Sequence, residues 1–158
     1  MGSLTLVLLL ALLQGGLRGE RPLPAFQVVT AEGAAVSSAQ LTGERQYLLV
    51  YVNAASSTSR KLLDAMGEWA TPELARRTVM VIGGTPQEAQ HFIESGVPES
   101  LQGMTRYFDT GRSAWQALNL RGSPVLLGVR DGKTEWSLSG VLGDPAALKS
   151  VVLTWVNF

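Results

Sequence analysis

A run of hydroxyl side chains, Ser56-Ser57-Thr58-Ser59, is followed by the basic residue Arg60 at the start of a predicted helix. A serine hydroxyl is a weak nucleophile unless a positioned base removes its proton. The one histidine, His91, falls in a helix predicted for residues 86–95, and nothing in the sequence places it beside Ser56. We therefore interpret the run as a helix N-cap, in which a hydroxyl accepts a hydrogen bond from a first-turn N–H, and not as a Ser-His hydrolase site.

The composition excludes several other chemistries. The chain of 158 residues has no cysteine, which rules out a disulfide, a thiolate zinc site, an iron–sulfur cluster and a cysteine nucleophile. A single histidine without clustered carboxylates does not make a metal site, so we expect neither a metal nor a cofactor. The 13 Lys+Arg balance 13 Asp+Glu, and this neutrality argues against a nucleic-acid partner.

Residues 1–19 are typical of a targeting segment. Residues 4–13 read LTLVLLLALL, a run of the length of a secretory signal and shorter than the roughly 20 residues that a transmembrane helix needs. Residues 1–5 contain no Lys or Arg, and the glycines that follow the run do not form a clean cleavage site. Two interpretations stay open, a cleaved signal peptide and a retained membrane anchor formed by residues 4–13. Both predict an exported domain over residues 20–158.

The elements that must position Ser56–Ser59 alternate between strand and helix. Apolar runs predict strands at 47–52, 78–82, 104–108, 125–129 and 134–139, the last two joined by a hairpin at Asp131-Gly132. Helical spacing of apolar residues predicts helices over 60–70, 86–95 and 111–119, and a last one capped by Asp144. This order predicts an α/β sandwich whose mixed sheet has parallel strands inside and an antiparallel pair at one side.

Several short motifs follow one another at a recognisable spacing. Asp109-x-Gly111 lies upstream of Gly122-Ser123-Pro124, which precedes the apolar strand 125–129 and the turn at Asp131-Gly132. In this order the motifs resemble the thioredoxin fold, and more specifically its exported TlpA-like and redoxin branch. The resemblance covers roughly Pro24 to Trp155 and implies a thioredoxin-like three-layer sandwich, with helices on both faces of a mixed central sheet.

The sequence departs from that family at the redox loop. The family loop carries W-C-x-x-C-R, and the aligned stretch is Ala55-Ser56-Ser57-Thr58-Ser59-Arg60, so Ser56 and Ser59 replace both cysteines and Arg60 keeps the basic residue. Leu62 and Asp64 stand where the family often has Glu and Pro. Because a hydroxyl cannot form or break an S–S bond, we expect a degenerate redox loop with no catalytic residue.

The Ser123-Pro124 step has two interpretations. In the family the equivalent proline is cis, lies against the redox loop and leaves the preceding backbone free to pair with an extended substrate. That implies a small peptide-binding edge at Ser123 and Pro124, a form of strand addition. The other interpretation is that a cis-proline at the start of a strand serves only to shape the turn.

The prediction that combines these observations is an exported, cysteine-free, redox-inactive thioredoxin-like domain. It would be a binding or structural protein whose partner is an extended polypeptide or another envelope protein, located in the periplasm, secreted or anchored outside the cytoplasm. The alternative is a thiol-disulfide oxidoreductase family member whose cysteines were removed by engineering, or whose chemistry has changed to use Ser56, Ser59 and Arg60. Engineering is the weaker version, because the changes at Ala55, Leu62 and Asp64 would not be needed to disarm the site.

Overall fold

An eight-stranded sheet runs through the protein in the computed structural model, which describes residues 20–139 and 143–157. The predicted targeting segment, residues 1–19, lies outside the described residues. The strands are β1 (Arg21–Pro22), β2 (Gln27–Val29), β3 (Ala35–Ser37), β4 (Gln46–Asn53), β5 (Thr78–Gly83), β6 (Thr105–Asp109), β7 (Val125–Arg130) and β8 (Lys133–Ser139). The α-helices are α2 (Ser57–Trp69), α3 (Pro72–Arg76), α4 (Pro86–Gly96), α5 (Ser113–Ala117) and α6 (Pro145–Val156), and short 3₁₀ turns lie at Ser38–Gln40 and Glu99–Leu101. Among the described residues, none of these helices has the length and apolar character needed to cross a membrane.

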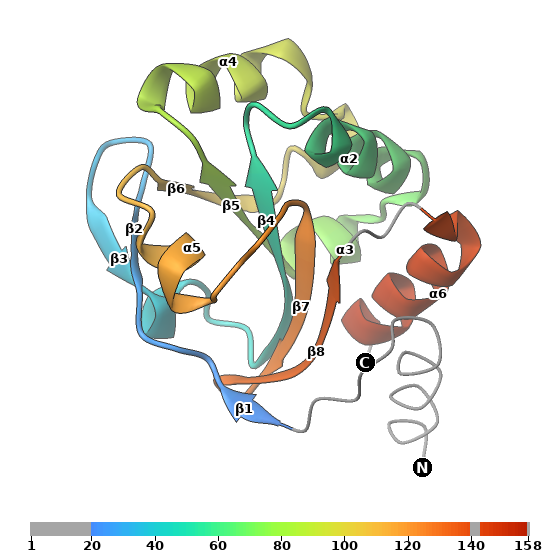
Figure 1. Cartoon of the computed structure of the whole chain (residues 1–158). Helices are drawn as coiled ribbons and strands as arrows, with labels where there is room; N and C mark the ends of the chain where they lie inside the picture. Colours follow the sequence, from blue (N-terminus) through green and yellow to red (C-terminus); the bar gives the residue numbers. More distant parts are fainter. Residues whose placement is uncertain (1–19, 140–142, 158) are drawn as a thin grey trace.

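The strand order is β1-β8-β7-β4-β5-β6-β2-β3. Strands β4, β5 and β6 are parallel, whereas β7 runs antiparallel to β4 and β8 antiparallel to β7 (Figure 1). Asp131 and Gly132 turn the β7–β8 hairpin with positive φ angles of 50° and 74°, a conformation that an Asp-Gly pair accommodates. The predicted mixed sheet, with parallel strands inside and an antiparallel pair at one side, is confirmed.

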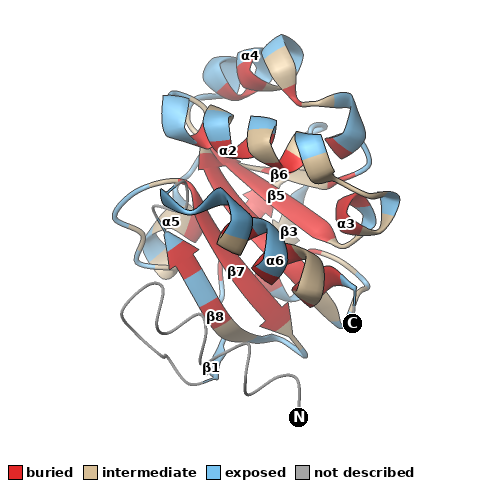
Figure 2. Cartoon of the chain, turned by 90° about the vertical axis from the view of Figure 1, so that its right-hand side faces the viewer, coloured by how far each residue is buried: buried red, intermediate tan, exposed pale blue. Residues whose placement is uncertain are grey.

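Alternate residues of β4 point into two different cores. Leu48, Val50 and Val52 pack into a core formed with α2, α3, α4 and α6, and these helices cover one face of the sheet (Figure 2). Tyr47, Leu49 and Tyr51 pack on the opposite face, beneath α5 and β2. All six side chains are buried, as the continuous apolar run predicted for a strand covered on both sides. The predicted three-layer sandwich with helices on both faces is therefore confirmed.

The N-terminal side of the sheet differs from the prediction. Before the first predicted strand at 47–52, the chain forms β2, a turn with Gly33 at φ 86°, and β3 paired antiparallel to β2. The two residues of β1 add a further strand beside β8. Both were missed because two- and three-residue strands are too short to show a period.

Capping residues fix where the helices begin. Asp144 accepts a hydrogen bond from the N–H of Ala147, which confirms its predicted capping role, and Thr85 accepts one from the N–H of Glu88. Pro86 and Pro145 occupy the first helical positions. Helix α2 begins at Ser57, earlier than expected, because the hydroxyl of Ser56 caps it. Helix α5 spans residues 113–117 and is shorter than the predicted 111–119.

Candidate functional site

The loop between β4 and α2 holds Ser56 and Ser59, two of the candidate residues chosen from the sequence. Ser56 is the N-cap of α2, and its Oγ accepts a hydrogen bond from the backbone N–H of Ser59 at 3.3 Å. This confirms the predicted capping role. The Ser59 side chain is completely buried, and its Oγ accepts from the backbone N–H of Asn53 at 3.1 Å. The loop is therefore held at both ends by serine hydroxyls.

The Ser123-Pro124 step lies directly against this loop. The peptide bond between the two residues is cis. The Ser59 hydroxyl donates to Ser123 Oγ at 3.4 Å, so residues 64 positions apart in the sequence meet side by side. The structure thus brings together Ser56, Ser59, Ser123 and Pro124, the candidate residues chosen from the sequence.

Arg60 does not join this cluster. Its guanidinium lies over the Phe92 ring at 4.4 Å from the centroid and donates to Ser95 Oγ at 3.0 Å and to the Phe92 carbonyl oxygen at 3.3 Å. All three partners are on α4 or at its end. Arg60 therefore ties α2 to α4, and its charged group is engaged away from the serine hydroxyls.

The residues around Ser56 do not activate it as a nucleophile. Within residues 20–139 and 143–157, the hydrogen bond that Ser56 Oγ makes is the one it accepts from Ser59, and no side-chain base contacts it. His91 is exposed on α4, the helix predicted to contain it. The described part of the chain also contains no group of three His, Cys, Asp or Glu residues that could hold a metal ion.

A buried carboxylate lies on the other face of the sheet, at the end of β6. Asp109 is 1% exposed and accepts hydrogen bonds from the Tyr51 hydroxyl at 2.7 Å and from the N–H groups of Ala114 and Trp115 at 3.0 and 2.9 Å. Burial, and then the hydrogen bond to this carboxylate, raise the pKa of Tyr51. The sequence showed Asp109 only as part of a spacing motif. Its partner Tyr51 lies 58 positions away, so sequence spacing could not reveal the pair.

A depression of about 750 Å³ adjoins the Ser123-Pro124 step on the α5 face of the sheet. Its lining residues come from the segment that follows α5, the start of β7, strand β8 and β1; Figure 1 shows where these elements lie. Gly122 and Val125, the residues on either side of Ser123-Pro124, both line it. We call it the β7–β8 depression.

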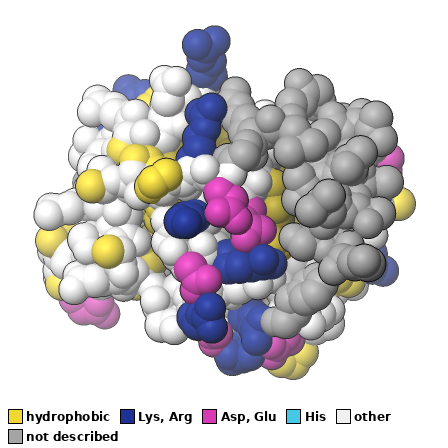
Figure 3. Space-filling view, turned by 90° about the horizontal axis from the view of Figure 1, so that it is seen from below, with side chains coloured by type: hydrophobic (Ala, Val, Ile, Leu, Met, Phe, Trp, Pro, Cys, Tyr) yellow, Lys and Arg dark blue, Asp and Glu magenta, His cyan; other side chains and the backbone are white. Residues whose placement is uncertain are grey.

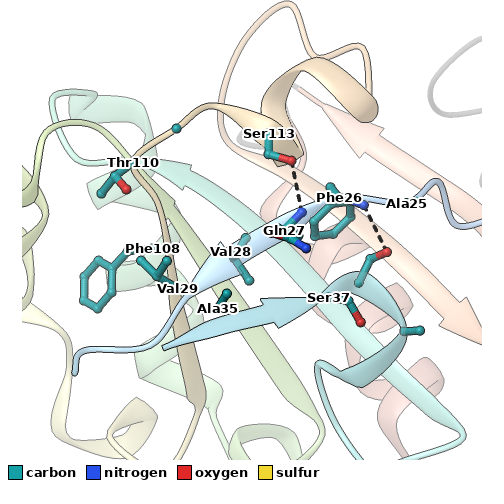
Figure 4. Close-up of a pocket in the computed structure, with 13 residues that line it drawn as sticks. Ala25, Phe26, Gln27, Val28, Val29, Ala35, Ser37, Phe108, Thr110 and Ser113 are labelled. Carbon is teal, nitrogen blue, oxygen red and sulfur yellow. Dashed lines mark hydrogen bonds between the residues drawn. The ribbon is translucent and has the colours of Figure 1, made fainter. Parts of the chain in front are cut away.

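A second depression, of about 660 Å³, lies at the other end of the sheet. Figure 4 shows its apolar side chains, among them Val28, Ala35 and Phe108, around strands β2 and β3. The backbone N–H of Gln27 is bonded to Ser113 Oγ at 3.0 Å, and that of Phe26 to Ser38 Oγ at 3.2 Å. These bonds tie β2 to its neighbours, and the residues that line this depression include none of the serine cluster.

Charged side chains of both signs lie close together on the underside of the molecule as it is drawn in Figure 1. Figure 3 shows Lys and Arg interleaved with Asp and Glu on this face. Ion pairs between described residues include Arg45–Asp131 at 2.8 Å and Arg77–Glu73 at 2.9 Å. The described side chains seen in Figure 3 therefore mix charges of both signs.

No protein-family model matches the sequence, and no curated protein matches it. Solved structures do match. A DsbE-type putative thiol:disulfide interchange protein from Chlorobium tepidum aligns with a TM-score of 0.68 and 19% identity, over 89% of this chain and 99% of that one. The chain has a thioredoxin fold.

Two other thioredoxin-fold structures agree. A secreted disulfide oxidoreductase of Mycobacterium tuberculosis, homologous to DsbE, gives a TM-score of 0.64 at 17% identity, over 82% of this chain and 95% of that one. The exposed lipoprotein thioredoxin Etrx1 of Streptococcus pneumoniae gives 0.61 at 12% identity, over 82% and 98%. At these identities the likeness establishes the fold. The chain is a thioredoxin-fold protein without a cysteine.

Proposed function

We propose that this protein is an exported, redox-inactive member of the TlpA-like and redoxin branch that binds an extended polypeptide at Ser123 and Pro124. The observation that supports it most is the hydrogen bond between Ser59 and Ser123 beside the cis-peptide bond. This bond holds the Ser56–Ser59 loop against the Ser123-Pro124 step, as a redox loop lies against its cis-proline in the family that the sequence resembles. Hydroxyl groups stand where that family has sulfur atoms.

The absence of redox chemistry follows from the atoms at the site. A thioredoxin-type reaction needs one thiolate to attack a disulfide and a second thiol to resolve the mixed disulfide. Ser56 and Ser59 supply hydroxyls, and both are used to hold the loop together. With Arg60 engaged by α4, the altered chemistry that would use Ser56, Ser59 and Arg60 has no support in this geometry.

Binding is supported by the backbone of Ser123. The β4–β7 ladder ends at Tyr51 and Val125, and the N–H of Asn53, two residues after Tyr51, is bonded to Ser59 Oγ. The N–H and C=O of Ser123 have no hydrogen-bond partner among the described residues, and the residue is half-buried. An extended segment that pairs with this backbone would satisfy both groups by strand addition.

Export is supported by two observations. Residues 4–13 form an apolar run of the length of a secretory signal. The structural neighbours include a protein described as secreted and one described as an exposed lipoprotein. We propose that residues 1–19 direct the domain out of the cytoplasm, as a cleaved signal or as a membrane anchor.

An insulin reduction assay with dithiothreitol tests the redox half of the proposal. The full-length chain should give no turnover above background. The matched control is the double variant Ser56→Cys with Ser59→Cys, which should form a disulfide that can be titrated, since Ser56 lies at the N-terminus of α2, where a thiolate is stabilised. Turnover by the unaltered chain would overturn the proposal. A double variant with no titratable redox couple would show that the alignment of the loop is wrong.

Fluorescence titration with extended synthetic peptides tests the binding half. The probe is a short peptide in which leucine alternates with glutamine, so that it is neutral and extended. We expect saturable binding by the full-length chain. The proposed function would be overturned if the chain bound neither this peptide nor the peptides in which glutamate or lysine replaces glutamine.

A further inference from the structure

The β7–β8 depression has cationic groups on its rim that nothing in the described structure neutralises. Arg21 of β1 and Arg121 of the segment before β7 both line it, and both are exposed. Neither guanidinium has an ion pair or hydrogen bond with any residue in 20–139 or 143–157. Among the described residues, none competes with a ligand for these two positive charges.

The one acidic residue that lines the depression does not offset these charges. Glu135 is 10% exposed and forms an ion pair with Arg130 at 3.2 Å. Its negative charge is thus already balanced by a cation from β7. The remaining charge of the rim is positive.

Part of the lining of the depression is apolar and can contact an apolar side chain. Leu118 and Leu120 of the segment after α5 and Val125 and Leu127 of β7 all line it and pack into the core on the α5 face. On β8, Ser137 pairs with Leu127, and its exposed hydroxyl adds a polar group beside this apolar surface. A segment lying here would meet apolar contacts inside and cations at the edge.

We propose that the polypeptide bound at this site is acidic, with carboxylates that contact Arg21 and Arg121 and an apolar side chain that enters the depression. This inference rests on the proposed function, because the extended segment must first pair at Ser123. The inference depends on the closeness of the two sites, because Gly122 and Val125 flank the Ser123-Pro124 step in the sequence and also line the depression. In an extended chain successive side chains point to opposite sides, and an arginine forms its strongest hydrogen bonds with a carboxylate.

The test compares three peptides of equal length in which leucine alternates with glutamate, glutamine or lysine. Fluorescence anisotropy of the labelled peptides is measured with the full-length chain at low ionic strength. A charge-assisted hydrogen bond is strong enough for about a tenfold change in affinity, so the glutamate peptide should bind about tenfold more tightly than the glutamine peptide. The lysine peptide should bind most weakly.

Charge reversal then locates the site. Arg121→Glu and Arg21→Glu should each lower the affinity for the glutamate peptide about tenfold and leave the glutamine peptide nearly unchanged. The matched control is Lys149→Glu, which makes the same charge change at an exposed residue of α6, on the other face of the sheet. An equal loss in the control variant would show that net charge, and not the rim, attracts the peptide.

The outcomes separate this inference from the proposed function. If the glutamine peptide binds and the glutamate peptide binds no more tightly, the inference is wrong and the proposed function stands. If the glutamate preference survives both arginine variants, the inference is also wrong. If none of the three peptides binds, both proposals fail.

Discussion

At the residue scale, the buried hydroxyl of Ser59 joins three segments of the chain. It accepts from the N–H of Asn53 at the end of β4, donates to Ser123 two residues before β7, and belongs to the first turn of α2. A buried hydroxyl without partners is costly, and here both of its hydrogen-bonding capacities are used. The serines therefore form a satisfied structural junction, and the loop does not depend on a disulfide for its shape.

The N-cap gives a direct test of this junction. Ser56→Ala removes the acceptor for the Ser59 N–H and should lower the free energy of unfolding by about 1 kcal/mol in urea titrations. The matched control is Ser57→Ala, because Ser57 is exposed in the same turn and caps nothing. Equal effects from the two substitutions would contradict the capping role of Ser56.

At the element scale, the Asp109 carboxylate joins β4, β6 and α5. Its bonds to the N–H groups of Ala114 and Trp115 hold the five-residue helix α5, and its bond from the Tyr51 hydroxyl fastens this assembly to the central strand. Helix α5 leads into the segment that lines the β7–β8 depression. The buried pair thus positions one wall of the proposed binding region.

Two tyrosine substitutions compare the stability lost when a hydroxyl no longer bonds to a carboxylate with that lost when it no longer bonds to a backbone carbonyl oxygen. Tyr51→Phe removes a hydrogen bond to a carboxylate and should cost about 2 kcal/mol of unfolding free energy, whereas Tyr107→Phe removes a bond of 2.7 Å to the Leu41 carbonyl oxygen and should cost about 1 kcal/mol. Chemical denaturation measures both. If Tyr51→Phe cost no more than Tyr107→Phe, the carboxylate would not have the anchoring role assigned to it.

Sequence patterns predicted the long elements and missed the short ones. Strand β4 was predictable because its run of apolar residues matches burial on both faces, and α4 and α6 because Thr85-Pro86 and Asp144-Pro145 are strong start signals. Strands β1 and β3 have too few residues for any period, and they are fixed by the strands they pair with.

The candidate site was predictable only in part. The resemblance to the thioredoxin fold implied that Pro124 lies against the Ser56–Ser59 loop, and the bond from Ser59 to Ser123 agrees with this. The position of Arg60 over Phe92 was not predictable, since it depends on how α4 packs against α2. The cationic residues of the depression were not predictable either, because Arg21 and Arg121 are 100 positions apart in the sequence and line the same depression only in the folded chain.

At the scale of the whole molecule, all three tyrosines lie in the core on the α5 face of the sheet. Burial, with a smaller contribution from Tyr107, raises the pKa of Tyr47 to about 12. Burial also raises the pKa of Tyr107, and burial with the Asp109 hydrogen bond raises that of Tyr51. Each phenol is therefore held in its neutral form more strongly in the folded state than in the unfolded chain.

The pH dependence of stability follows from these shifts. Above the ordinary tyrosine pKa of about 10 the unfolded chain releases protons that the folded protein retains, so the free energy of unfolding should fall as the pH rises from about 10 through 12. Phenolate absorbance should appear together with loss of tertiary structure in an alkaline titration. Phenolate formation near pH 10 in a protein that remains folded would contradict the burial of these side chains.

The central claim is that an extended peptide binds where a cysteine-free loop meets the cis-proline step. Chemical-shift mapping of the isotope-labelled full-length chain with the leucine–glutamate peptide tests it most directly. The account predicts that the largest amide shifts occur at Gly122, Ser123 and Val125 and at Ser59, with smaller shifts along β8. Saturable binding whose shifts lie elsewhere, for example around β2 and β3, with none at Ser123, would contradict it.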